Sequence, residues 1–145
     1  MKGISSFAVI AIVAAGCVSA SQPLPSTTGT AGTVQVSMGQ DFQLAAGQTG
    51  RVNGTPIAVM FRSVGADSRC PSNVQCVWAG DAVVNLSLSS TTTVSQAAAL
   101  HTTLDSKFAD YAGYRVKFVG LGPVPRSGST IPASSYVVTL QVSSP

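Results

Sequence analysis

Runs in which apolar and polar residues alternate recur along the chain from Thr33 onward, and they constrain its fold more than any other feature. A strand points successive side chains to opposite faces, so alternation predicts strands with one face on a core and one face in water. A Thr-rich run that leads to residues 97–99 adds a further strand. We therefore predict about seven strands, from alternating runs at 34–36, 42–44, 57–62, 84–89, 114–118 and 136–142 and from the run at 97–99.

No segment shows ten residues of convincing helical periodicity, and the composition agrees with this. The chain has no glutamate, and Ser, Thr, Gly, Ala and Val dominate it, whereas surface helices are usually built from Glu, Lys, Gln and Leu. Only residues 104–111 are expected to form one short turn of helix. The predicted fold of residues 33–145 is therefore all-β. It is an immunoglobulin-like antiparallel β-sandwich, with a small β-barrel as the alternative.

The first twenty residues have the layout of an export signal. Lys2 is followed by an unbroken apolar run at 7–15, which is too short to span a bilayer, since that takes about 20 apolar residues. Two cleavage sites compete. Val-Ser-Ala at 18–20 suits ordinary signal peptidase, whereas Ala-Ala-Gly-Cys at 14–17 resembles a bacterial lipobox, although that family usually has leucine where Ala14 stands. A cysteine placed directly after the apolar run favours the lipobox.

The lipobox resemblance divides the chain into a signal peptide at 1–16, a tether at 17–32 and the β-domain at 33–145. It implies that Cys17 becomes the first residue and carries several acyl chains, which suffice for stable membrane anchoring. The tether is rich in Ser, Thr, Pro and Gly, has no charge and is expected to be disordered. The predicted location is therefore outside the cytoplasm, on a membrane of the bacterial cell envelope. A periplasmic or secreted protein is the alternative.

The remaining two cysteines, Cys70 and Cys76, form an even pair in an oxidising compartment, which predicts a disulfide. The residues that follow Cys70 are Pro, Ser and Asn, which favour a turn. The spacing fits neither a zinc site nor a Cys-x-x-Cys redox pair, and we expect no metal and no cofactor. The bridge is therefore expected to shape a small loop within residues 67–81.

The same stretch contains a candidate binding loop. Its candidate binding residues are Asp67, Arg69, Pro71, Trp78 and Asp81. The charged residues are expected to form a local ion pair and turn caps, since a calcium site would need more carboxylates. Trp78 is the only tryptophan. It is expected to pack in the core against the disulfide, and an exposed anchor for a partner is the alternative. Gly80 is expected to allow a bulge or a close approach of backbone.

Asp-Ser-Arg-Cys-Pro at 67–71, followed by Cys-Val-Trp-Ala-Gly at 76–80, resembles a motif of an uncharacterised set of bacterial exported proteins and lipoproteins. These proteins also tend to end with a Tyr-rich strand, a Pro-x-Pro loop and a last Tyr strand. Tyr114, the residues Pro-Val-Pro at 123–125 and Tyr136 stand in those places. The resemblance covers about residues 42–143, and it implies membership in this set without implying an activity.

Motifs for catalysis are missing from the sequence. Gly-x-Ser-x-Gly, His-Glu-x-x-His, a Walker loop and a dinucleotide fingerprint do not occur, and paired-carboxylate hydrolysis would have to use the five aspartates. His101 is the only histidine and is expected to be a surface strand residue. The basic residues are spread out, so the sequence predicts no nucleic-acid partner.

The leading functional hypothesis is therefore a non-catalytic binding or structural module on the envelope, which contacts the membrane through its lipid and has an envelope or exported protein as its partner. A second hypothesis is an inhibitor of an exported protease that acts through the disulfide loop at 67–81, because a rigid loop is preorganised for binding. A third is an enzyme that uses His101, which would require a cleft with an aspartate within hydrogen-bond reach of that ring.

Overall fold

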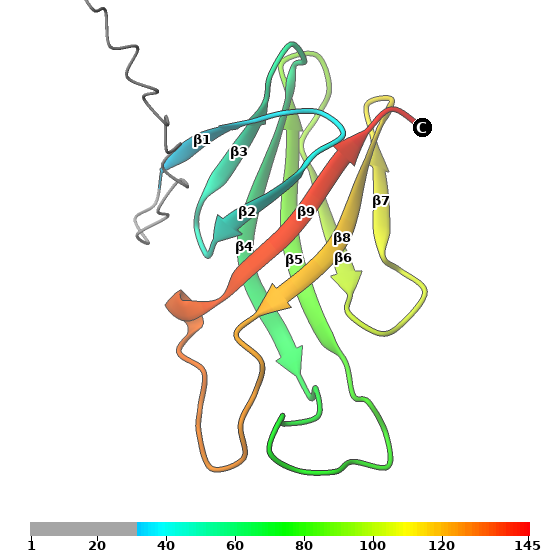
Figure 1. The fold of residues 1–145 in the computed structure, drawn as a ribbon. Helices are drawn as coiled ribbons and strands as arrows, with labels where there is room; N and C mark the ends of the chain where they lie inside the picture. The colour runs from blue at the N-terminus through cyan, green and yellow to red at the C-terminus, as the bar shows by residue number, and fades with distance from the viewer. Residues whose placement is uncertain (1–31) are drawn as a thin grey trace, which may run out of the picture.

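The computed structural model describes residues 32–145, which form two β-sheets packed face to face (Figure 1). The predicted signal peptide, Cys17 and the tether up to residue 31 lie outside the described residues. The sheets have five and four strands and do not close into a barrel. The predicted all-β sandwich is therefore confirmed, and the small barrel is not formed.

The five-stranded sheet has the order β1-β3-β4-β5-β6, and the four-stranded sheet has the order β2-β9-β8-β7. All neighbouring strands are antiparallel except β1 and β3, which pair in parallel. The strands of the first sheet are β1 (Thr33–Val36), β3 (Thr49–Val52), β4 (Ile57–Asp67), β5 (Ala82–Ser90) and β6 (Gln96–His101). Those of the second are β2 (Asp41–Ala45), β7 (Phe108–Tyr111), β8 (Tyr114–Gly122) and β9 (Val137–Ser143).

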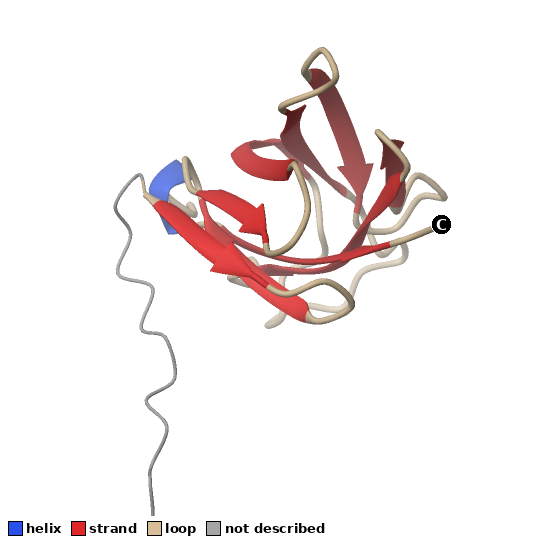
Figure 2. Ribbon diagram, turned by 90° about the horizontal axis from the view of Figure 1, so that it is seen from above, coloured by secondary structure: helices blue, strands red, loops and turns tan. Residues whose placement is uncertain are grey.

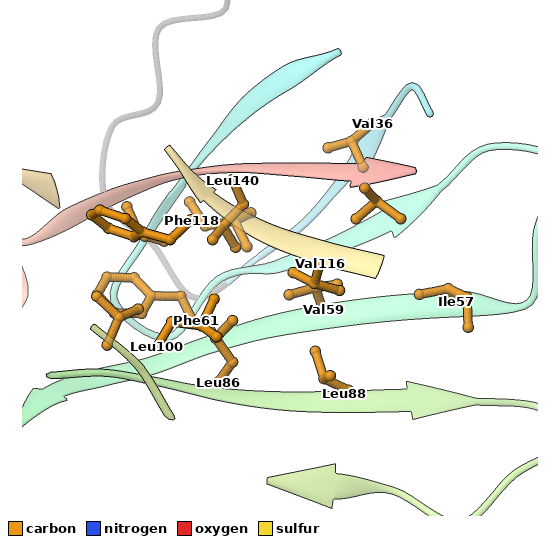
Figure 3. Close-up of a cluster of buried hydrophobic side chains, with 14 of the residues drawn as sticks. Val36, Ile57, Val59, Phe61, Leu86, Leu88, Leu100, Val116, Phe118 and Leu140 are labelled. Carbon is orange, nitrogen blue, oxygen red and sulfur yellow. The ribbon is translucent and has the colours of Figure 1, made fainter. Parts of the chain in front are cut away.

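Most of the side chains that point into the space between the sheets are those that the alternation selected, and Val52, Leu100 and Tyr111 are core residues that it did not select. Val59, Phe61 and Leu86 from one sheet meet Val116 and Leu140 from the other, and all of them are almost completely buried (Figure 3). Outward positions on the same strands are largely polar. Burial of the apolar face of each strand therefore sets the register, because a shift by one residue would turn that face to water.

Two strands, β3 and β7, were not predicted from the sequence, and the short helix expected within 104–111 is wrong. Phe108–Tyr111 is β7 instead, and it pairs with β8 through a two-residue turn. That turn uses Ala112 at φ 49° and Gly113 at φ 79°, a geometry usually signalled by Asn-Gly rather than Ala-Gly. The hairpin was missed because its turn residues gave only a weak signal.

Helix is almost absent from residues 32–145. The single described helix is the short 3₁₀ turn Ala133–Ser135, which lies at the periphery of the domain (Figure 2). Within these residues, no helix has the length and apolar character needed to span a bilayer.

Three loops lie together at one end of the sandwich, the lower end in Figure 1. They follow β4, β6 and β8, which all run toward that end. We call residues 68–81 the cysteine loop and residues 123–136 the proline loop, and the third loop comprises residues 102–107. This arrangement places the predicted binding loop beside two segments that are distant in the sequence.

Candidate functional site

The disulfide between Cys70 and Cys76 is present, as predicted, and their Cα atoms are 5.9 Å apart. It closes the tip of the cysteine loop, where the Val74 N–H also donates to the Pro71 carbonyl at 3.2 Å. Nearer the sheet, the two limbs of the loop are paired by backbone hydrogen bonds. The Ser68 N–H donates to the Asp81 carbonyl at 2.7 Å, and the Cys70 N–H donates to the Ala79 carbonyl at 2.9 Å. The loop thus continues the β4–β5 pairing beyond the sandwich.

Gly80 allows the two limbs to approach each other, as predicted. Its φ is +68°, in the left-handed region that side chains disfavour. A Cβ atom at this position would lie 1.8 Å from the Ser68 carbonyl oxygen. Only glycine therefore permits the observed contact between the limbs.

The predicted ion pair joins Asp67 and Arg69 at the base of the loop. The Arg69 guanidinium donates from Nε to Asp67 Oδ1 at 2.9 Å and from Nη2 to Oδ2 at 2.7 Å. The two side chains are only 13% and 11% exposed. Because the hydrogen bonds from Arg69 and Tyr136 outweigh the effect of burial, the pKa of Asp67 is lowered.

Arg69 and Asp67 also bind the cysteine loop to the proline loop. Arg69 Nη1 donates to the Leu121 carbonyl at 2.7 Å, and Nη2 donates to the Pro123 carbonyl at 3.0 Å. The Tyr136 hydroxyl donates to Asp67 Oδ2 at 2.9 Å. One charge pair thus fixes both ends of the proline loop.

Nearer the tip, two further hydrogen bonds join the same loops. The Ser72 N–H donates to the Pro125 carbonyl at 2.9 Å, and the Ser127 N–H donates to Asn73 Oδ1 at 2.8 Å. The Pro-x-Pro segment and the cysteine motif are therefore in direct contact. The two halves of the sequence pattern described above form one structural unit.

Asp81 does not join the ion pair of Asp67 and Arg69, but holds the third loop. Its carboxylate contacts His101 Nδ1 at 2.5 Å and accepts hydrogen bonds from the Thr102 hydroxyl at 3.0 Å and the Thr103 N–H at 2.9 Å. Burial acts to raise the pKa of Asp81, but the hydrogen bonds from His101, Thr103 and Thr102 outweigh it and hold the pKa at about 2. This cluster closes the other side of the cysteine loop.

The geometry gives His101 an aspartate partner, which the enzyme hypothesis required. His101 is the last residue of β6 and is only partly exposed. Within residues 32–145, no serine or threonine hydroxyl bonds to its other ring nitrogen, and the metal-ligand types do not gather in groups of three. The pair therefore stabilises a loop junction without a visible nucleophile beside it.

The expectation that Trp78 packs in the core is wrong. Its side chain is 83% exposed, and that of the neighbouring Val77 is 92% exposed. The reason is geometric: β8 of the opposite sheet ends at Gly122, beside the base of the cysteine loop, so the loop extends past the sandwich core. The proline loop covers residues near the tip but leaves Trp78 exposed. Pro71 is partly buried near the disulfide. The structure therefore presents the alternative, in which Trp78 is an exposed side chain on a rigid loop.

Acid is expected to weaken the junction at Asp81. A carboxyl whose folded pKa is about 2 stabilises the fold above its unfolded pKa of about 3.9, and this contribution is lost as the pH falls toward 2. Since Asp81 is partly exposed, we expect a loss of about 1–2 kcal/mol. Urea unfolding of the protein and of an Asp81→Asn variant at pH 5, 4, 3 and 2 measures this. The stability difference between the two should shrink with falling pH, and a constant difference would contradict the assignment.

Four residues of the contact network were not predicted as site residues: Asn73, Thr102, Thr103 and Tyr136. The Asp81 and Asp67 contacts span 20 residues to His101 and 69 residues to Tyr136. No local pattern signals such pairs, although the resemblance did place Tyr136 in the same motif set.

The chain matches no protein-family model, no curated protein and no solved structure.

Proposed function

We propose that this protein is a lipid-anchored, non-catalytic binding module of the bacterial cell envelope, and that its cysteine loop contacts a partner protein. One observation carries the proposal: two large apolar side chains, Val77 and Trp78, are 92% and 83% exposed on a loop that is braced on both sides. A soluble domain gains nothing for its own stability from this placement.

Rigidity makes the exposed pair suitable for binding. The disulfide, the Arg69 network and the Asp81 cluster hold the loop before any partner arrives, so little conformational entropy is lost on association. Tryptophan is among the residues that most often dominate the energy of protein interfaces. Residues 70–80 carry no charged side chain, so their burial requires no desolvation of a charge.

The Asp81 carboxylate braces the cysteine loop from its other side. Its Oδ1 accepts hydrogen bonds from Thr102 and Thr103 of the third loop, and its Oδ2 contacts His101 at the end of β6. The Thr103 hydroxyl also donates to the Gly80 carbonyl at 2.6 Å. These contacts brace the binding loop.

Partner binding is tested by crosslinking from the loop in intact cells. A photoreactive phenylalanine analogue at Val77 should capture a specific envelope protein, whereas the same analogue at Val94 should not. Val94 is a matched control because it is 87% exposed and lies in the β5–β6 turn at the opposite end of the domain. Trp78→Ala should abolish the crosslink and lower the affinity of the purified pair about 30-fold. Equal capture from both positions, or unchanged affinity, would reject the loop as the binding element.

The same experiment distinguishes the second candidate function. The exposed, disulfide-closed loop is also the shape that a protease inhibitor would use, with the loop held against cleavage. In that case the crosslinked partner is a protease. The protein described here slows the cleavage of a peptide substrate by that protease, while its own cysteine loop stays uncleaved. A partner without protease activity favours the binding module.

Membrane attachment is tested separately through Cys17. Cys17→Ser should release the protein from the membrane fraction or leave the leader uncut, because the lipid has no other acceptor in the lipobox. Fractionation and mass spectrometry of the mature N-terminus measure this. A mature protein that begins at Ser21 without a lipid would refute the anchor and leave the loop proposal untouched.

A further inference from the structure

Strand β6 is an edge strand with backbone groups that face away from its neighbour. The Thr102 N–H donates to the carbonyl of Ala82 in β5. Since residues of an antiparallel pair alternately face toward and away from the neighbouring strand, every second residue of β6 points its backbone N–H and C=O groups away from β5. His101 is one of these outward-facing residues, since its N–H donates to the Ser106 carbonyl in the third loop rather than to β5. The N–H and C=O groups of Ala97 and Ala99 point in the same outward direction. Both residues are exposed, and no hydrogen bond to these groups is found within the described chain.

The usual protections of an edge strand are missing from β6. Soluble proteins block such edges with lysine, proline, charged residues or a bulge. The segment Gln-Ala-Ala-Ala-Leu-His contains no lysine or proline, and its pairing with β5 shows no register shift. The edges of the other sheet differ, because β2 carries Asp41 and β7 carries Asp110. β6 therefore offers a flat and open edge.

A shallow groove of about 380 Å³ lies on the outer face of the sheet beside this edge. It is lined by Ala97, Ala98 and Ala99 of β6, by Arg62 and Ser63 of β4, and by Asn85 and Leu86 of β5. Arg62 sits where the β4–β5 register shifts, and it makes no ion pair within the described residues. It is the only charged side chain that lines the groove. The groove therefore combines small side chains with one unpaired positive charge.

We propose that the β6 edge binds an extended segment of a partner protein that carries an acidic side chain. The backbone of the segment pairs with Ala97 and Ala99 and adds a sixth strand to the sheet. Its outward side chains lie beside the alanines, which leave room for them. Its carboxylate is attracted by Arg62, which β5 and β6 separate from the added strand and which is the only charged side chain lining the groove. This site is separate from the cysteine loop, because it lies along the side of the sandwich rather than at its lower end.

Titration of the intact protein with capped seven-residue peptides tests this proposal. The probes are Thr-Val-Thr-Asp-Thr-Val-Thr and the same sequence with Asn or Lys in the centre. The Asp peptide should bind more tightly than the Asn peptide, and the Lys peptide should bind most weakly. Arg62→Ala should weaken the Asp peptide about threefold to fivefold and leave the Asn peptide unchanged. Arg51→Ala, which removes an exposed arginine from β3, is the matched control and should change neither.

Backbone pairing is tested by Ala99→Pro, which removes an N–H that does not bond to β5. This variant should weaken the binding of the Asp peptide about tenfold.

Amide hydrogen exchange gives a second measurement that needs no variant. The Ala97 and Ala99 amides should exchange quickly in the free protein and slowly with the Asp peptide, while Ala98 and Leu100 stay protected in both. Absence of Asp-peptide binding, equal affinity for the Asp and Lys peptides, or unchanged exchange at Ala97 and Ala99 would overturn the proposal. Protection that rises with protein concentration alone would also overturn it, because a second copy would then cover the edge.

Discussion

Replacement of Arg69 by alanine is expected to lower the free energy of unfolding by about 3 kcal/mol. The guanidinium makes two hydrogen bonds to Asp67 and one each to the carbonyls of Leu121 and Pro123. Its removal leaves a carboxylate that is only 11% exposed without its cationic partner. Such an uncompensated, largely buried charge destabilises a fold far more than the loss of a surface pair. Urea unfolding at pH 7, followed by circular dichroism, measures the change.

Arg115→Ala is the matched control for this prediction. Arg115 makes a similar two-point contact with Asp110, but the two side chains are 40% and 52% exposed, so water replaces the lost partner. We expect a much smaller loss there than for Arg69→Ala. Equal losses in the two variants would show that burial of the Asp67–Arg69 pair does not matter. The proposed role of this pair in bracing the cysteine loop would then be wrong.

Gly80→Ala is expected to destabilise the protein by about 3 kcal/mol, for two separate reasons. An alanine at φ +68° is conformationally strained, and its Cβ would lie 1.8 Å from the Ser68 carbonyl oxygen. Relief of this overlap must separate the limbs of the loop, which breaks the pairing of Ser68 with Asp81 and of Cys70 with Ala79. Chemical unfolding and hydrogen exchange at the Ser68 and Cys70 amides measure the two effects.

Gly113→Ala separates strain from contact. Gly113 has φ +79°, but a Cβ there would meet no atom within 4 Å. That variant should lose only about 1 kcal/mol, from backbone strain alone. If both glycine variants lose the same amount, the close approach of the loop limbs has no energetic importance. If Gly80→Ala is worse, as expected, it should also weaken the binding of a partner at Trp78, because it displaces the loop that carries this residue.

The sequence alone determined which residues form most of the sheets and which of their faces are buried. Val59, Phe61, Leu86, Val116 and Leu140 were all selected by alternation, and all lie in the core. The physical reason is local: successive side chains of a strand point to opposite faces, so a two-residue period in hydrophobicity needs no knowledge of the partner strand. The disulfide followed in the same way, because Cys70 and Cys76 are close in sequence and left as a pair.

Only the tertiary structure decided what surrounds the cysteine loop. Whether Trp78 is buried depends on where the opposite sheet ends, and no residue near Trp78 encodes that boundary. The contacts of Asp81 with His101 and of Asp67 with Tyr136 join segments 20 and 69 residues apart, which meet because β4, β6 and β8 all run toward the same end of the sandwich. Strand direction and sheet length are properties of the whole assembly. For that reason the residues that brace the loop, and the exposure of the residues it presents, become visible only once both sheets are in place.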